Sequence, residues 1–359
     1  MTGDLRGWPD RPRAGVLRHR STAARPRDAD ITAVRHPAAG TPSRAAGDGA
    51  YARAGTHTDG HDEHRERPAM NAMDDPRTAP TNPSAADDLD SRASAAATAA
   101  RMYDYFLGGV HNFAADRKAA QKIVADQPDV PMIAAANRAF LRRSVRYLTA
   151  NGVRQFLDIG SGIPTVGNVH EIAQAAAPGS RVVYVDIDPV AVDECREILA
   201  DNPDATAIRG DLQRPRQILD HRDVRNLIDL SQPVGLLLIA VLHFVPDDDR
   251  AYRAVAHLVD ALAPGSYVAL SHGASETFQP TTDRNTAADV YREHTSTPGK
   301  ARTRPEVEKF LTGLDLVEPG IVWVPRWRPD PHQPPQVLLA DNPARSGVWA
   351  AVAKRAAQP

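Results

Sequence analysis

The chain has 359 residues and a formal net charge of −2 at pH 7, so it lacks the basic surplus that is typical of nucleic-acid-binding proteins. Its length exceeds the ~100 to 200 residues of an ordinary domain and leaves room for one large domain with an additional segment. The single cysteine excludes an internal disulfide, no apolar run reaches the ~18 residues that span a membrane, and the first residues lack the apolar core of a secretory signal, so we expect a cytoplasmic protein.

The first 98 residues are predicted to be a disordered tail. They are rich in Ala, Arg, Pro, Gly, Asp and Thr, and they contain too few large apolar side chains to offset the entropy of ordering. Met70 and Met73 lie close to the start of the patterned region, so a second interpretation is that translation begins near Met70. The histidines from His19 to His64 have no ligand spacing, and no metal site is predicted.

Residues 99–150 are predicted to form a helical cap that precedes the main domain. Apolar residues recur at helical spacing over 114–125 and 132–148, with a proline-containing turn between the two segments. Tyr103 and Asn112, which lie ahead of these helices near a flexible glycine pair, are expected to face the ligand pocket.

The run from Arg154 to Gly162 indicates a buried strand that ends in a glycine turn. Gly160 and Gly162 suit a sharp bend at which a ligand approaches the backbone closely, because glycine has no Cβ. Asp186 lies 28 residues after Asp158, at the expected end of the next strand. A carboxylate there can accept hydrogen bonds from both hydroxyl groups of a ribose.

Two classes of nucleoside cofactor share this layout. A nicotinamide site favours a third glycine in the pattern G-x-G-x-x-G, but Thr165 stands at that place and Gly167 comes two positions late. Asp158, two residues before the first glycine, suits a ligand with a positive amino group better than one with phosphates. S-adenosylmethionine has an ammonium, a sulfonium and a ribose diol but no phosphate, so the sequence favours it. A turn that merely connects two elements is the alternative.

Further strands are predicted over 207–212, 234–241 and 266–272, with a helix over 247–262. Alternating strands and helices imply a parallel sheet covered on both faces, with ligands at the carboxyl ends of the strands. The polar residues expected at these ends are Asp158, Asp186, Asp211, His243 and His272.

Two later segments are predicted to complete the site. The polar, turn-rich stretch 276–305 is expected to form a second cap, because substrate loops are commonly inserted after such a strand. The proline-rich stretch 325–343 is predicted to be an extended crossing, with Trp323 and Trp327 packing nearby or lining an entrance.

Five motifs, in order, resemble those of a bacterial S-adenosylmethionine-dependent methyltransferase family that was once catalogued only as a domain of unknown function. They are Ala100–Gly109, Asn112–Arg117, Asp158–Thr165 with Gly167–Glu171, Val241–Phe244 and Leu270–His272. The chain departs from the family at Val110 and His111, where a Lys-Asp pair is more usual. The resemblance implies a class I methyltransferase fold over 151–359, an α/β Rossmann-like sheet of seven mostly parallel strands. The last strand, over 347–354, would run antiparallel.

The resemblance implies S-adenosylmethionine as cofactor, whereas it does not identify the methyl acceptor. A small molecule is expected, because the charge balance disfavours nucleic acid. The residues expected to contact the cofactor are Tyr103, Asn112, Asp158, Gly160, Ser161, Gly162, Thr165, Asn168, Asp186, Ile187, Asp211, Leu212, Val241 and His243. His243 and His272 are the candidate catalytic residues, since histidine is the usual general base near neutral pH. Structural roles remain the alternative for both histidines.

The leading hypothesis is therefore a methyltransferase that acts on a small molecule. A protein that senses S-adenosylmethionine or its demethylated product without catalysis would retain the same acids, so it remains the alternative. A nicotinamide-dependent oxidoreductase comes third, because the third glycine is displaced.

Overall fold

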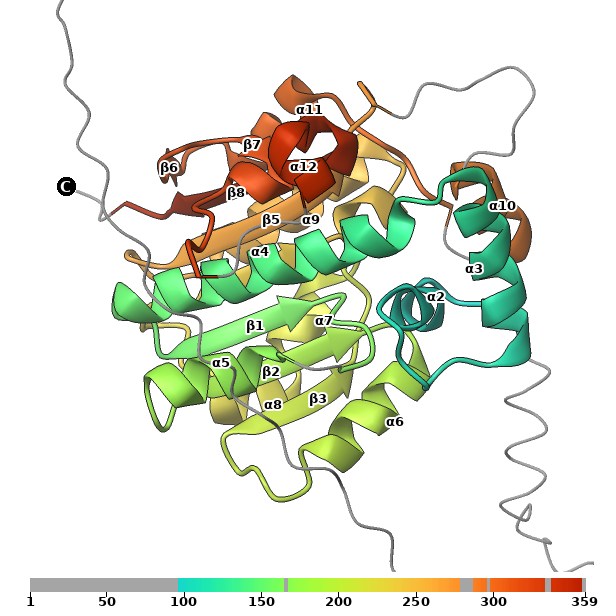
Figure 1. Cartoon of the computed structure of the whole chain (residues 1–359). Coiled ribbons are helices and arrows are strands. Elements are labelled where there is room, and N and C mark those ends of the chain that lie inside the picture. The colour runs from blue at the N-terminus through green and yellow to red at the C-terminus, as the bar shows by residue number, and fades with distance from the viewer. Residues whose placement is uncertain (1–95, 165–166, 278–286, 296–297, 333–336, 357–359) are drawn as a thin grey trace, which may run out of the picture. The chain divides into compact units, whose positions relative to one another are not determined.

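A sheet with helices packed on both of its faces forms the core of the protein (Figure 1). The computed structural model describes residues 96–164, 167–277, 287–295, 298–332 and 337–356, so the predicted tail lies outside the described residues up to position 95. The strands are β1 (Gln155–Ile159), β2 (Arg181–Asp186), β3 (Ala205–Arg209), β4 (Gly235–Ile239), β5 (Tyr267–Gly273), β6 (Asp315–Leu316), β7 (Val322–Trp323) and β8 (Val348–Lys354).

The strand order is β3-β2-β1-β4-β5-β8-β6, and β7 also pairs with β8. β1 to β5 pair in parallel, whereas β8 runs antiparallel to β5, which confirms the predicted sheet with an antiparallel last strand. The described sheet has eight strands rather than the predicted seven, because two short strands precede β8. Pro319 and the left-handed turn at Gly320 separate β6 from β7, since proline has no N–H for a strand ladder.

Eleven α-helices and four 3-10 turns surround the sheet within the described ranges. They are α2 (Ala99–Phe106), α3 (Ala114–Asp126), α4 (Val130–Ala150), α5 (Val169–Ala176), α6 (Pro189–Ile198), α7 (Pro215–Leu219), α8 (Arg222–Leu227), α9 (Asp248–Asp260), α10 (Ala287–His294), α11 (Arg304–Glu308), α12 (Val337–Asp341), η1 (Leu242–Phe244), η2 (Lys309–Leu311), η3 (Val324–Arg326) and η4 (Pro343–Ser346).

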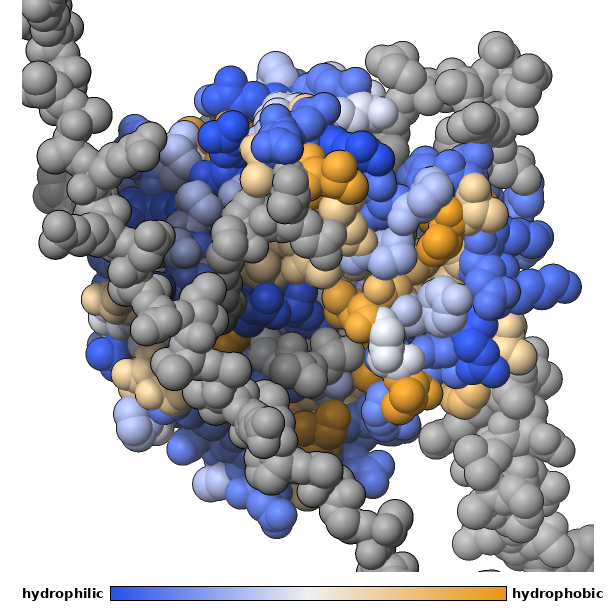
Figure 2. Space-filling model, in the orientation of Figure 1, coloured by the Kyte–Doolittle hydropathy of each residue, from blue (hydrophilic) through white to orange (hydrophobic). Residues whose placement is uncertain are grey.

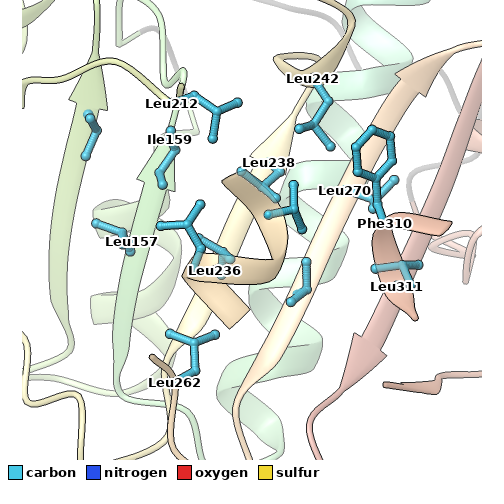
Figure 3. Close-up of a cluster of buried hydrophobic side chains, with 14 of the residues drawn as sticks. Leu157, Ile159, Leu212, Leu236, Leu238, Leu242, Leu262, Leu270, Phe310 and Leu311 are labelled. Carbon is cyan, nitrogen blue, oxygen red and sulfur yellow. The ribbon is translucent and has the colours of Figure 1, made fainter. Parts of the chain in front are cut away.

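One face of the sheet packs against α7, α8, α9 and η2. Figure 3 shows side chains of this cluster, with Leu157 and Leu236 of the central strands near each other and Leu270 of β5 beside Phe310 of η2. These strands are apolar on both faces because helices cover both sides, as is usual for parallel sheets. Burial of this cluster fixes the strand ends that carry the site.

The opposite face packs against α4, α5 and α6, which lie in front of the strands in Figure 1. Phe140 and Leu148 of α4 are fully buried there, and Cys195 of α6 is a small buried side chain in the same cluster. The predicted cap segment 99–150 therefore ends in a helix that belongs to the core of the main domain. The division at position 150 remains a prediction, since the described residues all lie within one unit, Arg77–Pro359.

A third hydrophobic cluster joins α2, α3, the start of α4 and α10. Met102, Phe106, Ile123 and Val290 are buried in it. In Figure 1 these helices lie at the end of the sheet toward which the arrows of β1 and β2 point. Helical spacing had predicted α3 and α4, and both helices are confirmed within two residues at each end.

The proline-rich stretch 325–343 is not an extended crossing throughout. Its described residues include η3, α12 and η4, and η3 and η4 each carry proline in their first turn. Proline is compatible with a first turn because its missing N–H has no partner there. Trp327 packs edge-on against Phe140, and Trp323 stacks on Trp349, so both indoles pack rather than line an entrance.

Hydrophobic side chains form only small, separated areas on the face shown in Figure 2. In the part of the chain that the structure describes, no helix has the length and apolar character needed to span a membrane. The same residues contain no group of three or more His, Cys, Asp or Glu that could hold a metal ion.

Candidate active site

A cavity of 1090 Å³ opens at the carboxyl ends of the parallel strands. Its walls come from the glycine turn after β1, the loops after β2 and β3, η1 after β4, and the cap helices α2, α3, α4 and α10. Parallel sheets place ligands at this edge because every strand ends there. The second predicted cap, 276–305, contributes α10 and the residues around Lys300, while 278–286 and 296–297 lie outside the described residues.

The glycine turn bends sharply at the tip of β1. Gly160 and Gly162 adopt φ angles of 72° and 66°, a left-handed conformation that other residues rarely adopt. A Cβ at Gly160 would overlap the side chain of Val241, which approaches from the end of β4. The Gly162 N–H donates to the Asp186 Oδ2 at 2.8 Å, so the turn and the acid at the end of β2 are held together.

Two buried carboxylates, Asp158 and Asp186, contribute to the cavity wall. Burial raises the pKa of Asp158 to about 7, the charge of Asp186 adds to this rise, and the charge of Arg138 opposes it. Burial also raises the pKa of Asp186 to about 6, although the N–H groups of Asp188 and Gly162 donate to it and lower the pKa. Two buried acids with raised pKa values suit a ligand that carries positive charge.

The cap is tied to the loop that follows Asp186. The hydroxyl of Thr98 donates to Asp188 Oδ2 at 2.5 Å, and the guanidinium of Arg101 lies 3.7 Å from the same oxygen. Arg101 also pairs with the fully buried Asp116 of α3 at 2.9 Å. The N–H of Asp188 donates to Asp186, the acid predicted to bind a ribose. The cap is therefore connected to Asp186 through Asp188 alone.

The loops after β2 and β3 place Ile187, Asp211 and Leu212 at the cavity. β3 ends at Arg209, so Asp211 lies two residues beyond the strand and not at its last position. Its carboxylate accepts a hydrogen bond from the Gln213 N–H at 2.8 Å, which fixes its orientation. Ser161 is also part of the wall, as predicted for the turn.

His243 lies in η1, directly after β4, and lines the cavity. Burial, together with the charge of Arg302, lowers its pKa to about 4, so the imidazole is neutral at physiological pH. Its Nδ1 is buried without a hydrogen-bond partner among the described residues. The rings of Phe244 and His272 contact it edge-on at centroid distances of 4.3 and 5.7 Å.

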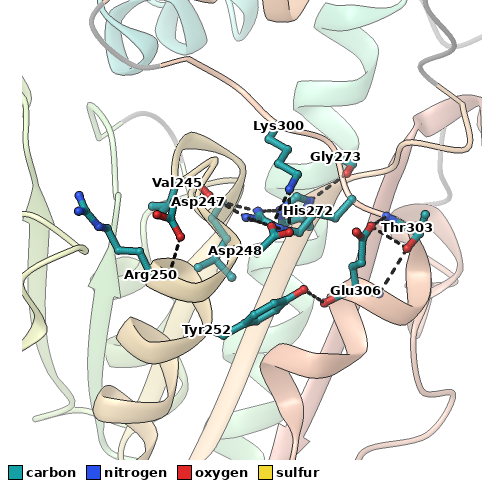
Figure 4. Close-up of polar contacts among 12 residues, drawn as sticks. Val245, Asp247, Asp248, Arg250, Tyr252, His272, Gly273, Lys300, Thr303 and Glu306 are labelled. Carbon is teal, nitrogen blue, oxygen red and sulfur yellow. Dashed lines mark hydrogen bonds and ion pairs between the residues drawn. The ribbon is translucent and has the colours of Figure 1, made fainter.

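His272 is not among the residues that line the cavity, and its role as a candidate catalytic residue stays a prediction. The side chain is fully buried; its Nδ1–H donates to the Gly273 carbonyl at 2.8 Å, and its Nε2 accepts from Arg302 at 2.9 Å (Figure 4). An arginine can only donate, so Nε2 must be unprotonated. Burial holds the pKa of His272 well below its usual value. Both ring nitrogens of His272 therefore have partners within the protein.

A buried arginine that sequence reasoning missed organises this region. The guanidinium of Arg302 donates to the carbonyls of Leu242 and Val245, at 3.1 and 2.7 Å, and so holds both ends of η1. It also pairs with Asp248 at the start of α9, to which Lys300 is bonded as well (Figure 4). No local pattern marks Arg302, because its partners lie 30 to 60 residues away in the sequence.

Two other predicted cofactor contacts, Asn112 and Asn168, are not part of the cavity wall. The amide of Asn112 donates to Asp104 Oδ2 and to the Gly109 carbonyl, and it holds the loop before α3. Asn168 begins α5 in a capping box with Glu171. Thr165 lies outside the described residues.

Several cavity residues were not predicted. Asn137 donates to the hydroxyl of Tyr103, which itself lines the cavity as expected, and accepts from Ser271 of β5 at 2.6 Å. Arg138 on the next position of α4 influences the pKa of Asp158. Helical periodicity places both residues in α4. The signal that could have identified them is that they are two consecutive polar residues within an otherwise apolar helix pattern.

Two solved structures are similar to this chain over most of their length. A proposed methyltransferase from Thermobifida fusca, solved at 1.95 Å resolution, is 39% identical, with a TM-score of 0.66 over 73% of this chain and 96% of that one. A DUF574 family protein from Streptomyces avermitilis is 40% identical, with a TM-score of 0.65 over 72% of this chain and 98% of that one.

No protein with a curated description matches this chain. The family model described as S-adenosyl methyltransferase matches residues 84–356, which include the glycine turn, both buried acids and the antiparallel last strand. The chain therefore belongs to the S-adenosyl methyltransferase family, whose members are S-adenosylmethionine-dependent enzymes with a class I methyltransferase fold.

Proposed function

We propose that the cavity binds S-adenosylmethionine against β1, β2 and β3 and transfers its methyl group to a small-molecule acceptor bound under the cap. The observation that carries this proposal is the pair of buried acids, Asp158 and Asp186, beside the left-handed glycine turn. A cationic ligand with a ribose would provide a positively charged partner for these carboxylates. Its ribose would provide hydroxyl groups that Asp186 can bind.

The remaining walls fit the other parts of the cofactor. Asp211 and Leu212 lie on the loop after β3, where an acid can accept a hydrogen bond from an adenine amine. Gly160, Ser161 and Gly162 leave the backbone open to close approach, and Val241 closes the cavity from the β4 side. Ile187 is half-exposed beside Asp186 and can cover one face of a flat ring.

When bound, S-adenosylmethionine supplies an electrophilic methyl group whose bond to sulfur breaks as the acceptor's lone pair forms the new bond. Residues of the chain contribute mainly by holding the acceptor in line with that methyl and by excluding water. The neutral imidazole of His243 can accept a hydrogen bond from a hydroxyl or amino group. Because its pKa is about 4, His243 is a weak base. We infer that it orients the acceptor and that the released proton passes to solvent.

Calorimetric titration of the full chain with S-adenosylmethionine, S-adenosylhomocysteine and NAD tests this assignment. We expect micromolar binding of the first two ligands, no binding of NAD, and at least a tenfold loss of affinity in Asp186→Ala. The matched control is Asp220→Ala, an exposed acid that pairs with Arg225 at the surface. Full affinity in Asp186→Ala would show that the cofactor binds elsewhere. Tight binding with no methyl transfer to any class of acceptor would instead favour the sensor.

A further inference from the structure

Aromatic side chains from three separate segments line the part of the cavity under the cap. Tyr103 and Phe106 come from α2, Phe244 from η1 and Tyr291 from α10. The rings of Phe244 and Tyr291 meet edge-on with centroids 5.2 Å apart, an arrangement that aromatic rings prefer. We call the space bordered by these four side chains the aromatic compartment.

The aromatic compartment is completed by aliphatic side chains of α3 and α4. Ile123, Val130 and Ile133 belong to the same cavity wall. Ligand pockets usually measure about 300 to 1,000 Å³. With 1090 Å³, the whole cavity exceeds that range and has space for a second molecule beside the cofactor.

The polar side chains of Tyr103 and Asn137, at the edge of the aromatic compartment, are already bonded within the protein. The hydroxyl of Tyr103 donates to the Ala134 carbonyl at 3.2 Å and accepts from Asn137 at 3.0 Å. The Asn137 side-chain oxygen accepts from Ser271. Burial raises the pKa of Tyr103 and of Tyr291, so both phenols remain neutral at physiological pH.

The charged side chains that border the aromatic compartment have opposite charges beside them; the charge of Arg138, which acts on Tyr103, also acts on the buried Asp158. Asp289 and Arg292 of α10 form an ion pair at 2.7 Å, and Lys300 is bonded to Asp248 at 2.8 Å. A charged acceptor entering this space would leave water without gaining a partner of opposite charge, which is unfavourable. A flat, uncharged molecule would bury its faces against the aromatic walls instead.

We propose that the aromatic compartment selects a neutral aromatic acceptor whose hydroxyl or amino group receives the methyl. This inference rests on the proposed function and adds the chemical class of the substrate. His243, at the boundary between the aromatic compartment and the glycine turn, accepts the hydrogen bond of that hydroxyl or amino group. The oxygen or nitrogen forms a bond to the methyl carbon, the carbon–sulfur bond breaks, and one proton is released to solvent.

The test uses the full chain saturated with S-adenosylhomocysteine, which allows binding without turnover. The probes are 1-naphthol, its charged analogue 1-naphthol-2-sulfonate, and glucose as a neutral molecule without an aromatic face. We expect 1-naphthol to bind at least tenfold more tightly than either of the others. Tyr291→Ala should weaken 1-naphthol binding about 10- to 100-fold, as expected for loss of about 1.5 to 3 kcal/mol of aromatic contact.

Tyr105→Ala is the matched control, because Tyr105 lies next to Phe106 on α2 but outside the cavity wall. It should bind 1-naphthol as the unmodified chain does. Equal or tighter binding of the sulfonate, or no binding of 1-naphthol, would overturn the proposal. The affinity for S-adenosylhomocysteine is measured separately in each protein. If the unmodified chain does not bind S-adenosylhomocysteine, the proposed function is contradicted, whereas the proposed acceptor class is not.

Discussion

The charge of Asp158, a carboxyl in the cavity wall, depends on its burial. Its carboxyl has a pKa of about 7 in the folded protein against a usual value of 3.8, mainly because of burial. A folded-state pKa that is raised above the unfolded value adds stability below pH 3.8, and this stability is lost as the pH rises through 7. At pH 8 the folded protein without cofactor therefore holds an unfavourable buried charge.

We expect Asp158→Asn to stabilise the cofactor-free protein at pH 8 and to stabilise it less, by about 1.6 kcal/mol, at pH 5, because above pH 3.8 the unfolded carboxyl ionises while the folded one stays protonated. The gain at pH 8 is at most about 4 kcal/mol, since each unit of pKa shift corresponds to about 1.4 kcal/mol. Thermal denaturation at both pH values measures the difference. A melting temperature that falls at pH 8, or rises equally at both pH values, would contradict the buried and ionised state of this acid.

The second prediction at the scale of single residues concerns the close contact between Gly160 and Val241. Gly160→Ala should abolish cofactor binding, because its Cβ would overlap Val241 and its φ of 72° strains any other residue. Val241→Ala removes the overlap, so the double variant should regain part of the affinity, although the backbone strain of about 1 to 2 kcal/mol remains. Calorimetric titration of the three variants measures this. Equal loss in the single and double variants would show that contact with Val241 is not the cause.

At the scale of elements, the connection between the cap and the sheet depends on Arg101. This buried arginine joins α2 to Asp116 of α3 and to Asp188 after β2. Removing one partner of a buried ion pair leaves the others without compensation, at a cost of about 3 to 5 kcal/mol. The cap and the loop after β2 are therefore expected to lose their order together.

Arg101→Gln should lower the free energy of unfolding by about 3 to 5 kcal/mol and weaken cofactor binding, although Arg101 is not part of the cavity wall. Arg225→Gln is the control, since its pair with Asp220 is exposed and should be worth less than about 1 kcal/mol. Urea denaturation and calorimetry provide both quantities. If the cofactor affinity of Arg101→Gln is unchanged, the link through Asp188 does not reach the site.

Local sequence patterns explain which elements could be predicted. The glycine turn and the acids at 158 and 186 can be recognised from the few residues around them. The apolar runs of β4 and β5 likewise indicate buried strands. Successive residues of a strand point to opposite faces, so Ser271 reaches Asn137 while His272 reaches Arg302. The sequence predicted the position of His272 at a strand end but not the face to which it points.

At the scale of the whole molecule, the unpredicted part of the site comes from long-range contacts. The aromatic compartment combines Phe106, Phe244 and Tyr291, which are more than 45 residues apart and show no common pattern. Asn112 was expected at the pocket, but the turn at Gly108 and Gly109 directs its amide back to Asp104. The cofactor half of the cavity was therefore easier to predict than the acceptor half.

The pH dependence of cofactor affinity tests the central claim most directly. If Asp158 and Asp186 bind S-adenosylmethionine as carboxylates, protons must leave them when it binds below their pKa values of about 7 and 6. Calorimetric titration should then show affinity rising on the order of 100-fold from pH 5.5 to pH 8 in the unmodified chain, with a smaller rise in Asp158→Asn. An affinity that is independent of pH in the unmodified chain would contradict the assignment of these two acids to the cofactor.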